Sequence, residues 1–176
     1  DAILGVFVYN ISLMEYFQFR FFEKSSIERK KWAGTGYMYE YQKNMNPKGA
    51  REILENKILF LNHFRSVITR KYYSLNELKI DLSLAGKILN NFSGKVVLKG
   101  SRGQIGAEVE VIKCCNHSAS TLLEYMEENK YDLVEEYVVQ HPLLMALSPT
   151  GLNTVRLFTQ LNNNGVDILG ARLRIS

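Results

Sequence analysis

The segment "KVVLKGSRGQIGAEVEVIK", from Lys95 to Lys113, predicts two β-strands joined by a glycine-rich loop. Valine and isoleucine recur on both sides of the loop, and β-branched residues favour strands. Residues two apart on a strand share a face. We therefore expect Val97 and Lys99 on one face of the first strand, with Val96 and Leu98 on the other. Lys99 then ends that strand at the mouth of the loop.

The glycines of this loop allow two interpretations. Glycine has no Cβ to block close approach and can adopt positive φ, and consecutive backbone N–H groups can bind an anion. A lysine at the loop mouth adds a mobile positive charge for phosphate oxygens. The segment therefore suits a flap over a polyphosphate. The alternative is a long hairpin loop that needs glycine for its turns.

Two better-known phosphate loops are excluded by the residue order. No Gly-Lys-Ser/Thr follows the glycines, so the loop is not a Walker A motif. In protein kinases the glycine loop precedes its strand lysine, whereas here the lysine comes first.

The composition is that of an ordinary soluble globular protein. The 176 residues fit one domain or a pair of lobes, with 46% apolar and 23% charged residues. Lysine and arginine exceed aspartate and glutamate by 22 − 18 = 4, which suits a nucleotide but is too small an excess to indicate nucleic acid. No window approaches 18 unbroken apolar residues, so we expect no membrane span. The adjacent Cys114 and Cys115 predict reduced thiols in a cytoplasmic protein.

Helical patterns dominate the first half of the chain. Dense aromatic residues predict an apolar face within residues 8–31 that packs on the rest of the protein, with a nucleic-acid stacking platform as the alternative. Residues 32–48 carry turn formers and are interpreted as a connecting segment. Apolar spacings of three and four predict a helix over residues 50–70. The Ser74–Glu77 capping box starts another helix that fades near residue 90.

Strand patterns dominate the second half. A helix is predicted over residues 118–130, with Thr121 and Glu124 as a capping box. "YDLVEEYVVQHP" predicts a short strand that ends before Pro142, and "NTVRLFTQL" and "VDILGARLRI" predict a hairpin around the turn signal "NNNG". Glu108 and Glu110 are expected on a solvated strand face. The order of elements predicts an α+β fold with antiparallel pairing.

The lysine-then-glycine order carries a family resemblance. "VVLKGSRGQIG", followed after a helix by "LVEEYVVQH", resembles the ATP-grasp family, in which the nucleotide lies between two α+β lobes. Further segments resemble its sugar-transfer-associated branch, whose members are related to α-L-glutamate ligases: "EYFQFRFFE", "ENKILFLNHF", "EEYVVQHPLLMALSPTGLNTVRLFT" and "ILGARLRI". The resemblance covers nearly the whole chain and is most specific from Glu135 to Thr159. It implies N-terminal helices and a connecting segment at 1–48, a lobe with glycine flap and hinge at 49–141, and the beginning of a truncated larger lobe at 142–176.

The resemblance also implies an ATP site. Lys57 matches the first nucleotide-binding lysine, although Asn56 replaces the usual acidic residue before it, and Lys99 matches the second, which binds the α- and β-phosphates. The Glu136 carbonyl and the Val138 N–H are expected at the adenine edge, with Gln140 or His141 at the ribose. The flap residues are Gly100, Ser101, Arg102, Gly103 and Gly106, the hinge residues are Glu135, Glu136, Tyr137 and Val138, and the catalytic residues are Arg156, Arg172 and Arg174.

Several of these assignments have a plain structural alternative. Lys57 could be a solvated helix lysine, and His141 a polar loop residue. Adjacent strand residues face opposite ways, so at least one of Glu135 and Glu136 is expected to be exposed. Arg156 alternates with apolar neighbours and faces either a ligand cleft or solvent. The register of the last hairpin is undetermined, so either Arg172 or Arg174 could join it.

The function implied by the resemblance is that of an ATP-dependent carboxylate ligase in cell-surface polysaccharide biosynthesis. A substrate carboxylate would attack the γ-phosphate to give an acylphosphate, which an amine or other nucleophile then displaces. The family also uses Mg²⁺, with ligands on strands after the matched region, so they are expected beyond Ser176 and this chain is expected to be inactive alone. The substrates stay unknown, with sugar-linked compounds as candidates, and no nucleic-acid partner is expected. The alternative is a non-catalytic nucleotide-binding or protein-interaction module.

Overall fold

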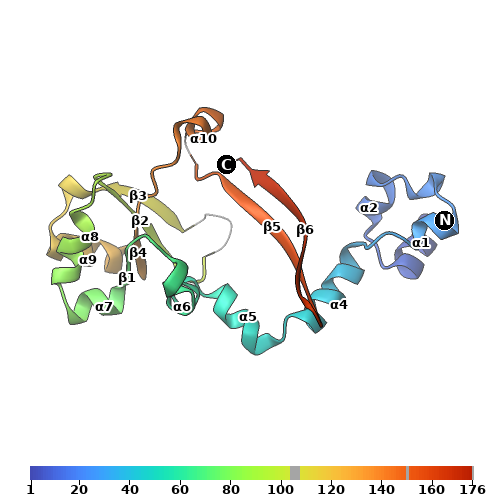
Figure 1. Ribbon diagram of the computed structural model, residues 1–176, viewed down its shortest axis with the longest axis horizontal. Coiled ribbons are helices and arrows are strands. Elements are labelled where there is room, and N and C mark those ends of the chain that lie inside the picture. Colours follow the sequence, from blue (N-terminus) through green and yellow to red (C-terminus); the bar gives the residue numbers. More distant parts are fainter. Residues whose placement is uncertain (104–107, 150, 176) are drawn as a thin grey trace. The chain divides into compact units, whose positions relative to one another are not determined.

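The computed structural model describes residues 1–103, 108–149 and 151–175. The chain divides into two compact units, Asp1–His63 and Phe64–Ser176 (Figure 1). The elements described in the first unit are helical, and both sheets lie in the second. The mixture of helices with antiparallel sheets confirms the predicted α+β class, while the domain limits at residues 48 and 141 stay predictions.

The first unit begins with a small aromatic core. Ile11, Tyr16 and Phe21 are buried in it, and Arg29 closes one side by donating to the Asp1 carboxylate at 2.8 Å and to the Phe21 carbonyl at 2.8 Å. The predicted apolar face is therefore present, although other aromatic residues of this segment are exposed. The helices of this unit are α1 (Ala2–Tyr9), α2 (Leu13–Gln18), η1 (Phe21–Glu23), α3 (Ser26–Arg29), α4 (Thr35–Met45), α5 (Lys48–Glu55) and α6 (Lys57–His63).

The interpretation of residues 32–48 as a connecting segment was wrong, because α4 occupies most of it. Gly34 is the N-cap and offers no side chain to the first turn. The Glu15 carboxylate supplies the cap instead, accepting from the Thr35 N–H at 3.0 Å and from the Thr35 hydroxyl at 2.7 Å. Such a cap from 20 residues upstream stabilises the helix N-terminus but leaves no local sequence signal.

Two predicted helices are each interrupted by a short polar side chain. The helix predicted over 50–70 divides at Asn56, whose side-chain oxygen accepts from Ile58 N at 2.9 Å and starts α6, and η2 (Arg65–Val67) follows. The helix predicted from Ser74 divides into α7 (Leu75–Ile80) and α8 (Ser83–Leu89) at Asp81, which accepts from Ser83 N at 3.0 Å. Asparagine and aspartate compete in this way with the helical hydrogen bonds.

The capping signals were partly right. The Ser74–Glu77 box is confirmed, with Ser74 at the N-cap of α7. The box predicted at Thr121 and Glu124 was wrong by one turn. The N-cap of α9 (Ala119–Glu128) is Ser118, and Thr121 is its partner at the third helical position.

Four antiparallel strands form the larger of the two sheets of the second unit, in the order β1-β4-β2-β3. The predicted strand–loop–strand is confirmed as β2 (Lys95–Lys99) and β3 (Val109–Lys113), followed by η3 (Cys114–Asn116). β4 (Leu133–Glu136) inserts between β1 (Tyr72–Ser74) and β2, and it is the short strand expected before Pro142. Figure 1 shows α7, α8 and α9 packed on one side of this sheet.

The covered face of the sheet holds the main core. Val96, Leu98 and Val134 are fully buried there against Leu122 and Met126 of α9. Val96 and Leu98 thus take the buried face that the alternation predicted, and Val97 and Lys99 are left on the opposite face. That opposite face carries the candidate site.

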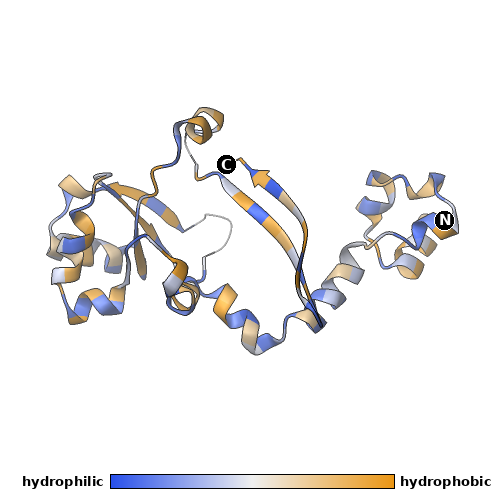
Figure 2. Ribbon diagram, viewed as in Figure 1, coloured by the Kyte–Doolittle hydropathy of each residue, from blue (hydrophilic) through white to orange (hydrophobic). Residues whose placement is uncertain are grey.

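The last elements are α10 (Pro142–Leu147) and the predicted hairpin, formed by β5 (Thr154–Asn162) and β6 (Gly165–Arg174). Hydrophobic and hydrophilic residues alternate along both strands (Figure 2). A register shift between Phe158 and Thr159 places a bulge in the ribbon. The two strands pair with each other and are exposed along nearly their whole length.

Candidate functional site

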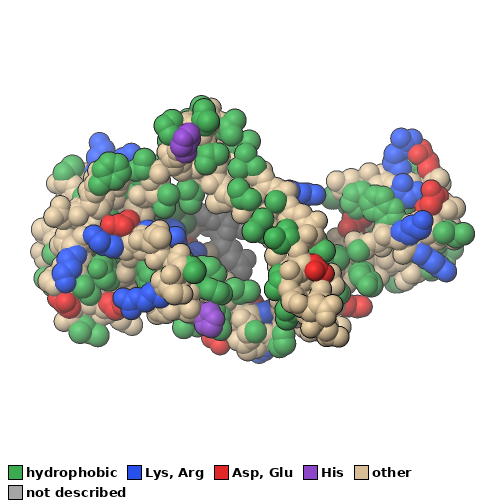
Figure 3. All heavy atoms as spheres, viewed as in Figure 1, with side chains coloured by type: hydrophobic (Ala, Val, Ile, Leu, Met, Phe, Trp, Pro, Cys, Tyr) green, Lys and Arg blue, Asp and Glu red, His purple; other side chains and the backbone are tan. Residues whose placement is uncertain are grey.

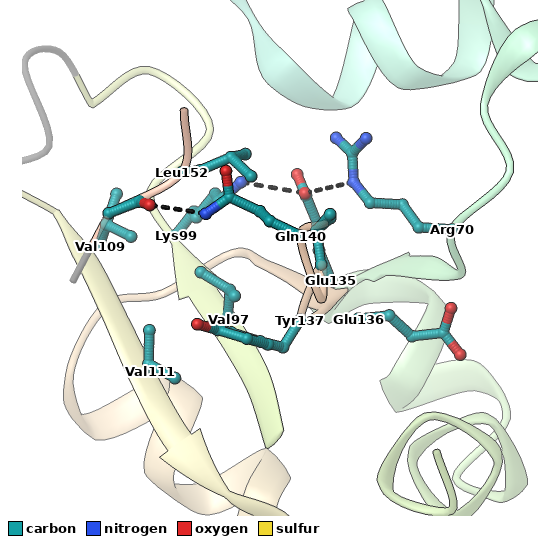
Figure 4. Close-up of a pocket in the computed structure, with 12 residues that line it drawn as sticks. Arg70, Val97, Lys99, Val109, Val111, Glu135, Glu136, Tyr137, Gln140 and Leu152 are labelled. Atoms are coloured by element: carbon teal, nitrogen blue, oxygen red, sulfur yellow. Dashed lines mark hydrogen bonds and ion pairs between the residues drawn. The ribbon is translucent and has the colours of Figure 1, made fainter. Parts of the chain in front are cut away.

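A cavity of about 370 Å³ lies on the sheet face opposite the core. Its size lies within the range of small-molecule sites. Figure 4 shows its residues, which come from β2, β3, β4 and the segments that flank them. The residues that line it are Arg70, Val97, Lys99, Val109, Val111, Glu135, Glu136, Tyr137, Val138, Gln140, Gly151 and Leu152.

The strand register explains why these side chains meet. Directly opposite residues of an antiparallel pair share a face. Val97 stands opposite Glu135 on one side and Val111 on the other, and Lys99 stands opposite Val109. Two rows of side chains therefore cross the sheet on the cavity side. One row consists of Glu135, Val97 and Val111, and it carries the carboxylate. The other row consists of Lys99 and Val109, and it carries the ammonium group.

An ion cluster of Arg70, Glu135 and Lys99 forms the polar wall of the cavity. Oε2 of Glu135 accepts from Arg70 Nε at 2.7 Å and from Lys99 Nζ at 2.9 Å (Figure 4). Glu135 is only 3% exposed. Burial by itself raises the pKa of its carboxyl, but the charge of Lys99 and the hydrogen bond from Arg70 outweigh burial and hold the pKa below its ordinary value. The carboxylate is therefore ionised at neutral pH.

Neither glutamate of the hinge is an exposed strand acid, so that expectation was wrong. Glu136 is partly buried and accepts from the Lys71 N–H at 2.9 Å, with Lys71 Nζ at 3.5 Å. It points away from Glu135 in the close-up (Figure 4). Arg70, 65 residues before Glu135, was missed by the sequence analysis, because no local pattern links two residues so far apart in the chain.

The remaining walls of the cavity are apolar. Val97, Val109 and Val111 expose their side chains to it, and Tyr137 lies beside them with Lys95 Nζ 5.3 Å from its ring centre. Glu110 was expected on a solvated face, which was wrong. It turns to the helical side, where Tyr125 donates to its carboxylate at 2.9 Å.

The described part of the glycine loop is anchored at Ser101. Its N–H and hydroxyl both donate to the Asp132 carboxylate, and Ser101 is only 7% exposed. Asp132 directly precedes β4, so this contact ties the loop to the strand that carries Glu135. The role of Asp132 was not predicted from the sequence, because 31 residues separate it from Ser101. Arg102 is exposed, and Gly106 lies outside the described residues.

Gly100 and Gly103 lie close to the side chain of Glu108, whose carboxylate would have to move if either residue carried a Cβ. A Cβ at Gly100 would lie 2.0 Å from Oε2 of Glu108, and one at Gly103 would lie 2.5 Å from the same atom. The Gly100 N–H also donates to the Glu108 carbonyl at 3.1 Å. The carboxylate of Glu108 therefore lies against the glycine backbone in this structure. Both interpretations of the loop stay open, since backbone that accepts one close anion can accept another.

Gln140 and His141 hold local structure. The Gln140 amide donates to the Gly151 carbonyl at 2.7 Å and accepts from the Asn153 N–H at 2.7 Å, which fixes the segment carrying Leu152 at the cavity wall. Nδ1 of His141 accepts from the Leu143 N–H at 3.3 Å and caps α10. A ribose contact by either residue stays a prediction.

The three arginines assigned to catalysis share one face of the hairpin. Arg156 stands directly opposite Arg172, and Arg174, two residues further on, stands opposite Thr154. The register of the hairpin, which the sequence left undetermined, therefore places both Arg172 and Arg174 on the same face as Arg156. The Arg172 guanidinium also lies 5.6 Å from the Phe158 ring centre. The catalytic assignment itself stays a prediction, as does the nucleotide contact of Lys57, which begins α6 in the first unit.

The described residues contain no group of three or more histidine, cysteine, aspartate or glutamate side chains that could hold a metal ion. None of the helices described is both long and apolar enough to cross a membrane.

The cavity and its ion cluster lie in a mixed helix-and-sheet unit, in which the described part of the glycine loop is tied to the segment that leads into β4. A protein-family model described as "Sugar-transfer associated ATP-grasp" matches residues 37–176. The chain belongs to this family, which confirms the resemblance stated above. The segment "EYFQFRFFE" at residues 15–23 precedes the match. No curated protein and no solved structure was found to match the chain.

Proposed function

We propose that this chain is the ATP-binding part of an ATP-dependent carboxylate ligase and that the cavity beside Lys99 holds the nucleotide. The observation that carries this proposal is the convergence of Lys99 and three valines on one sheet face, in a member of the ATP-grasp family. The apolar side chains would cover the adenine ring. The Glu136 carbonyl and the Val138 N–H would bind its edge, and Lys99 would neutralise the α- and β-phosphates.

The proposed reaction is acyl transfer through an acylphosphate. An oxygen of the substrate carboxylate attacks the γ-phosphorus, the bond to the bridging oxygen breaks, and ADP leaves. A nucleophile then attacks the acyl carbon and displaces phosphate. The chain's own contribution is to position the nucleotide and to neutralise charge, with Lys99 at the phosphates and Arg156, Arg172 and Arg174 at the acyl group. No step is routed through Mg²⁺.

The biological setting is proposed from the family alone. Its description as sugar-transfer associated supports a sugar-linked substrate. The proposal extends to a role in cell-surface polysaccharide biosynthesis and to a cytoplasmic location. The carboxylate donor and the nucleophile are expected to be found by testing amino acids and acidic sugars for ATP-dependent phosphate release.

The test is nucleotide binding by the full protein, measured as a thermal shift with ATP. Ligand at about 100 times its Kd should stabilise by about 2.7 kcal/mol. Lys99→Ala should remove most of this gain, whereas the matched control Lys87→Ala, on the exposed surface of α8, should retain it. No shift in the wild type at saturating ATP would contradict the proposal. If ATP binds but none of the tested pairs of carboxylic acid and nucleophile leads to ADP release, the non-catalytic alternative would be favoured.

A further inference from the structure

Glu135 has two cationic partners where one would neutralise it. Both hydrogen bonds end on the same oxygen, Oε2, from Arg70 at 2.7 Å and from Lys99 at 2.9 Å. The side chain of Glu135 is 4% exposed, compared with 32% for Arg70 and 22% for Lys99. The carboxylate is therefore the deeply buried member, and the two cations reach it from the cavity side.

The two cations approach from opposite flanks of the strand that carries Glu135. Lys99 ends β2, on one side of β4, and Arg70 precedes β1, on the other side. Figure 4 shows Arg70 with its Nε toward Glu135 and its terminal nitrogens turned away. The two contacts are thus carried by separate segments of backbone, so one can break while the other stays.

This independence matters for any anion that binds Lys99. A buried carboxylate that loses its counterion is strongly destabilised. If Lys99 were the sole partner of Glu135, moving its ammonium group to a phosphate would leave that charge uncompensated. The Lys99–Glu135 pair would then compete with the ligand for the same ammonium group.

We propose that Arg70 is a positioning residue which serves as the standing counterion of Glu135 and so releases Lys99 to bind the phosphates of a nucleotide. The inference rests on the proposed function of the cavity. In the free protein Lys99 pairs with Glu135, and in the nucleotide complex it pairs with phosphate while Arg70 stays on Glu135. Arg70 acts through Lys99 and need not touch the ligand.

The test compares ATP with adenosine by calorimetry in the wild type, Arg70→Gln, Glu135→Gln and the double variant. Arg70→Gln should weaken ATP binding about tenfold, because Lys99 is then the sole partner of Glu135, and adenosine binding should change less than about twofold. Adding Glu135→Gln should restore ATP binding, since a neutral amide no longer holds the ammonium group. Arg70→Lys, which keeps the charge, should lose little.

The outcomes separate this inference from the proposed function. If the wild type binds neither ligand, the proposed function fails and takes the inference with it. If the wild type binds both and Arg70→Gln weakens both equally, or the double variant stays weak toward ATP, only the inference is overturned. A double variant that still binds ATP weakly would mean that Arg70 contacts the phosphates itself.

A second measurement uses the folded wild type, in case Arg70→Gln does not fold. The Nε–H resonance of Arg70, assigned by its loss in Arg70→Lys, should stay protected from solvent exchange when ATP saturates the protein. Loss of that protection on ATP binding would overturn the inference, because Arg70 would then have left Glu135 together with Lys99.

Discussion

The four-stranded sheet and the β5–β6 hairpin share the same alternation of apolar and polar residues but use it differently. In the sheet, Val96 and Leu98 are buried under α8 and α9, while Val97 and Lys99 line a cavity on the other face. In the hairpin, Arg156 and Arg172 occupy one face. The opposite face exposes its hydrophobic side chains: Val155, Leu157, Leu161, Val166, Ile168 and Leu173. Hydrophobic side chains are visible on the surface of the hairpin in Figure 3.

The difference shows that the alternation of apolar and polar residues predicts which side chains share a face of a strand, but not whether that face is buried or exposed. A face becomes a core only where another element covers it, and the opposite face then becomes a rigid platform for a site. The charged residues also differ between the covered sheet and the exposed hairpin. Lys99 in the sheet has a buried carboxylate as partner, whereas Arg156 in the hairpin faces another cation.

The largest effect is expected from a substitution in the buried core of the sheet. Leu98→Ala should lower the free energy of unfolding by about 3 kcal/mol, because it removes a fully buried side chain and leaves a cavity. Leu157→Ala removes the same atoms from a residue that is 57% exposed and should change it by less than about 0.5 kcal/mol. Urea unfolding followed by circular dichroism measures both. Equal losses would mean that the hairpin face is covered in solution.

A somewhat smaller effect is expected at the ion cluster. Glu135→Ala should lower the free energy of unfolding by about 2 kcal/mol, since it strands two cations that are only partly exposed to water. Arg174→Ala on the exposed hairpin is the control and should cost less than about 0.5 kcal/mol. A negligible loss in Glu135→Ala would show that the cluster does not stabilise the sheet.

The same cluster predicts a pH dependence with a definite sign. The pKa of Glu135 in the folded protein lies below its ordinary value of 4.5, so the ionised form stabilises the fold. That contribution should be fully present above about pH 4.5 and lost as the pH falls through the folded pKa. Unfolding measured across this range should show a steeper acid-side decline in the wild type than in Glu135→Gln. Parallel curves would contradict the assignment.

The smallest effect concerns the hairpin charges. Arg156→Glu replaces a like-charged cross-strand pair with an opposite-charged one and should stabilise the hairpin by about 0.5 kcal/mol. Val155→Glu, opposite Leu173 on the other face, is the matched control and should give no such gain. Amide exchange of β5 measures both variants. A loss of protection in Arg156→Glu would indicate that another anion already holds these arginines.

The sequence predicted those features that depend on short-range patterns. The period-two alternation located β2, β3 and the terminal hairpin, and the Ser74–Glu77 signal located the start of α7. The placement of Arg172 and Arg174 on the same face as Arg156 could not be predicted, because the bulge sets the register only after folding.

Features that depend on distant contacts were missed for one physical reason. The cap of α4 comes from Glu15, the anchor of the glycine loop comes from Asp132, and the second partner of Glu135 is Arg70. In each case a polar side chain meets a group that is 20 or more residues away along the chain. Only the fold brings these groups within hydrogen-bond distance.

The most direct test of the nucleotide site is methyl NMR of valine-labelled full protein during titration with ATP. The account predicts that Val97, Val109 and Val111 in the cavity shift and saturate together, while Val155 and Val166 on the apolar face of the hairpin shift little. Adenosine should shift the same cavity valines, because the ring rather than the phosphates covers them. Shifts confined to residues outside the cavity, or none at saturating ATP, would contradict the account.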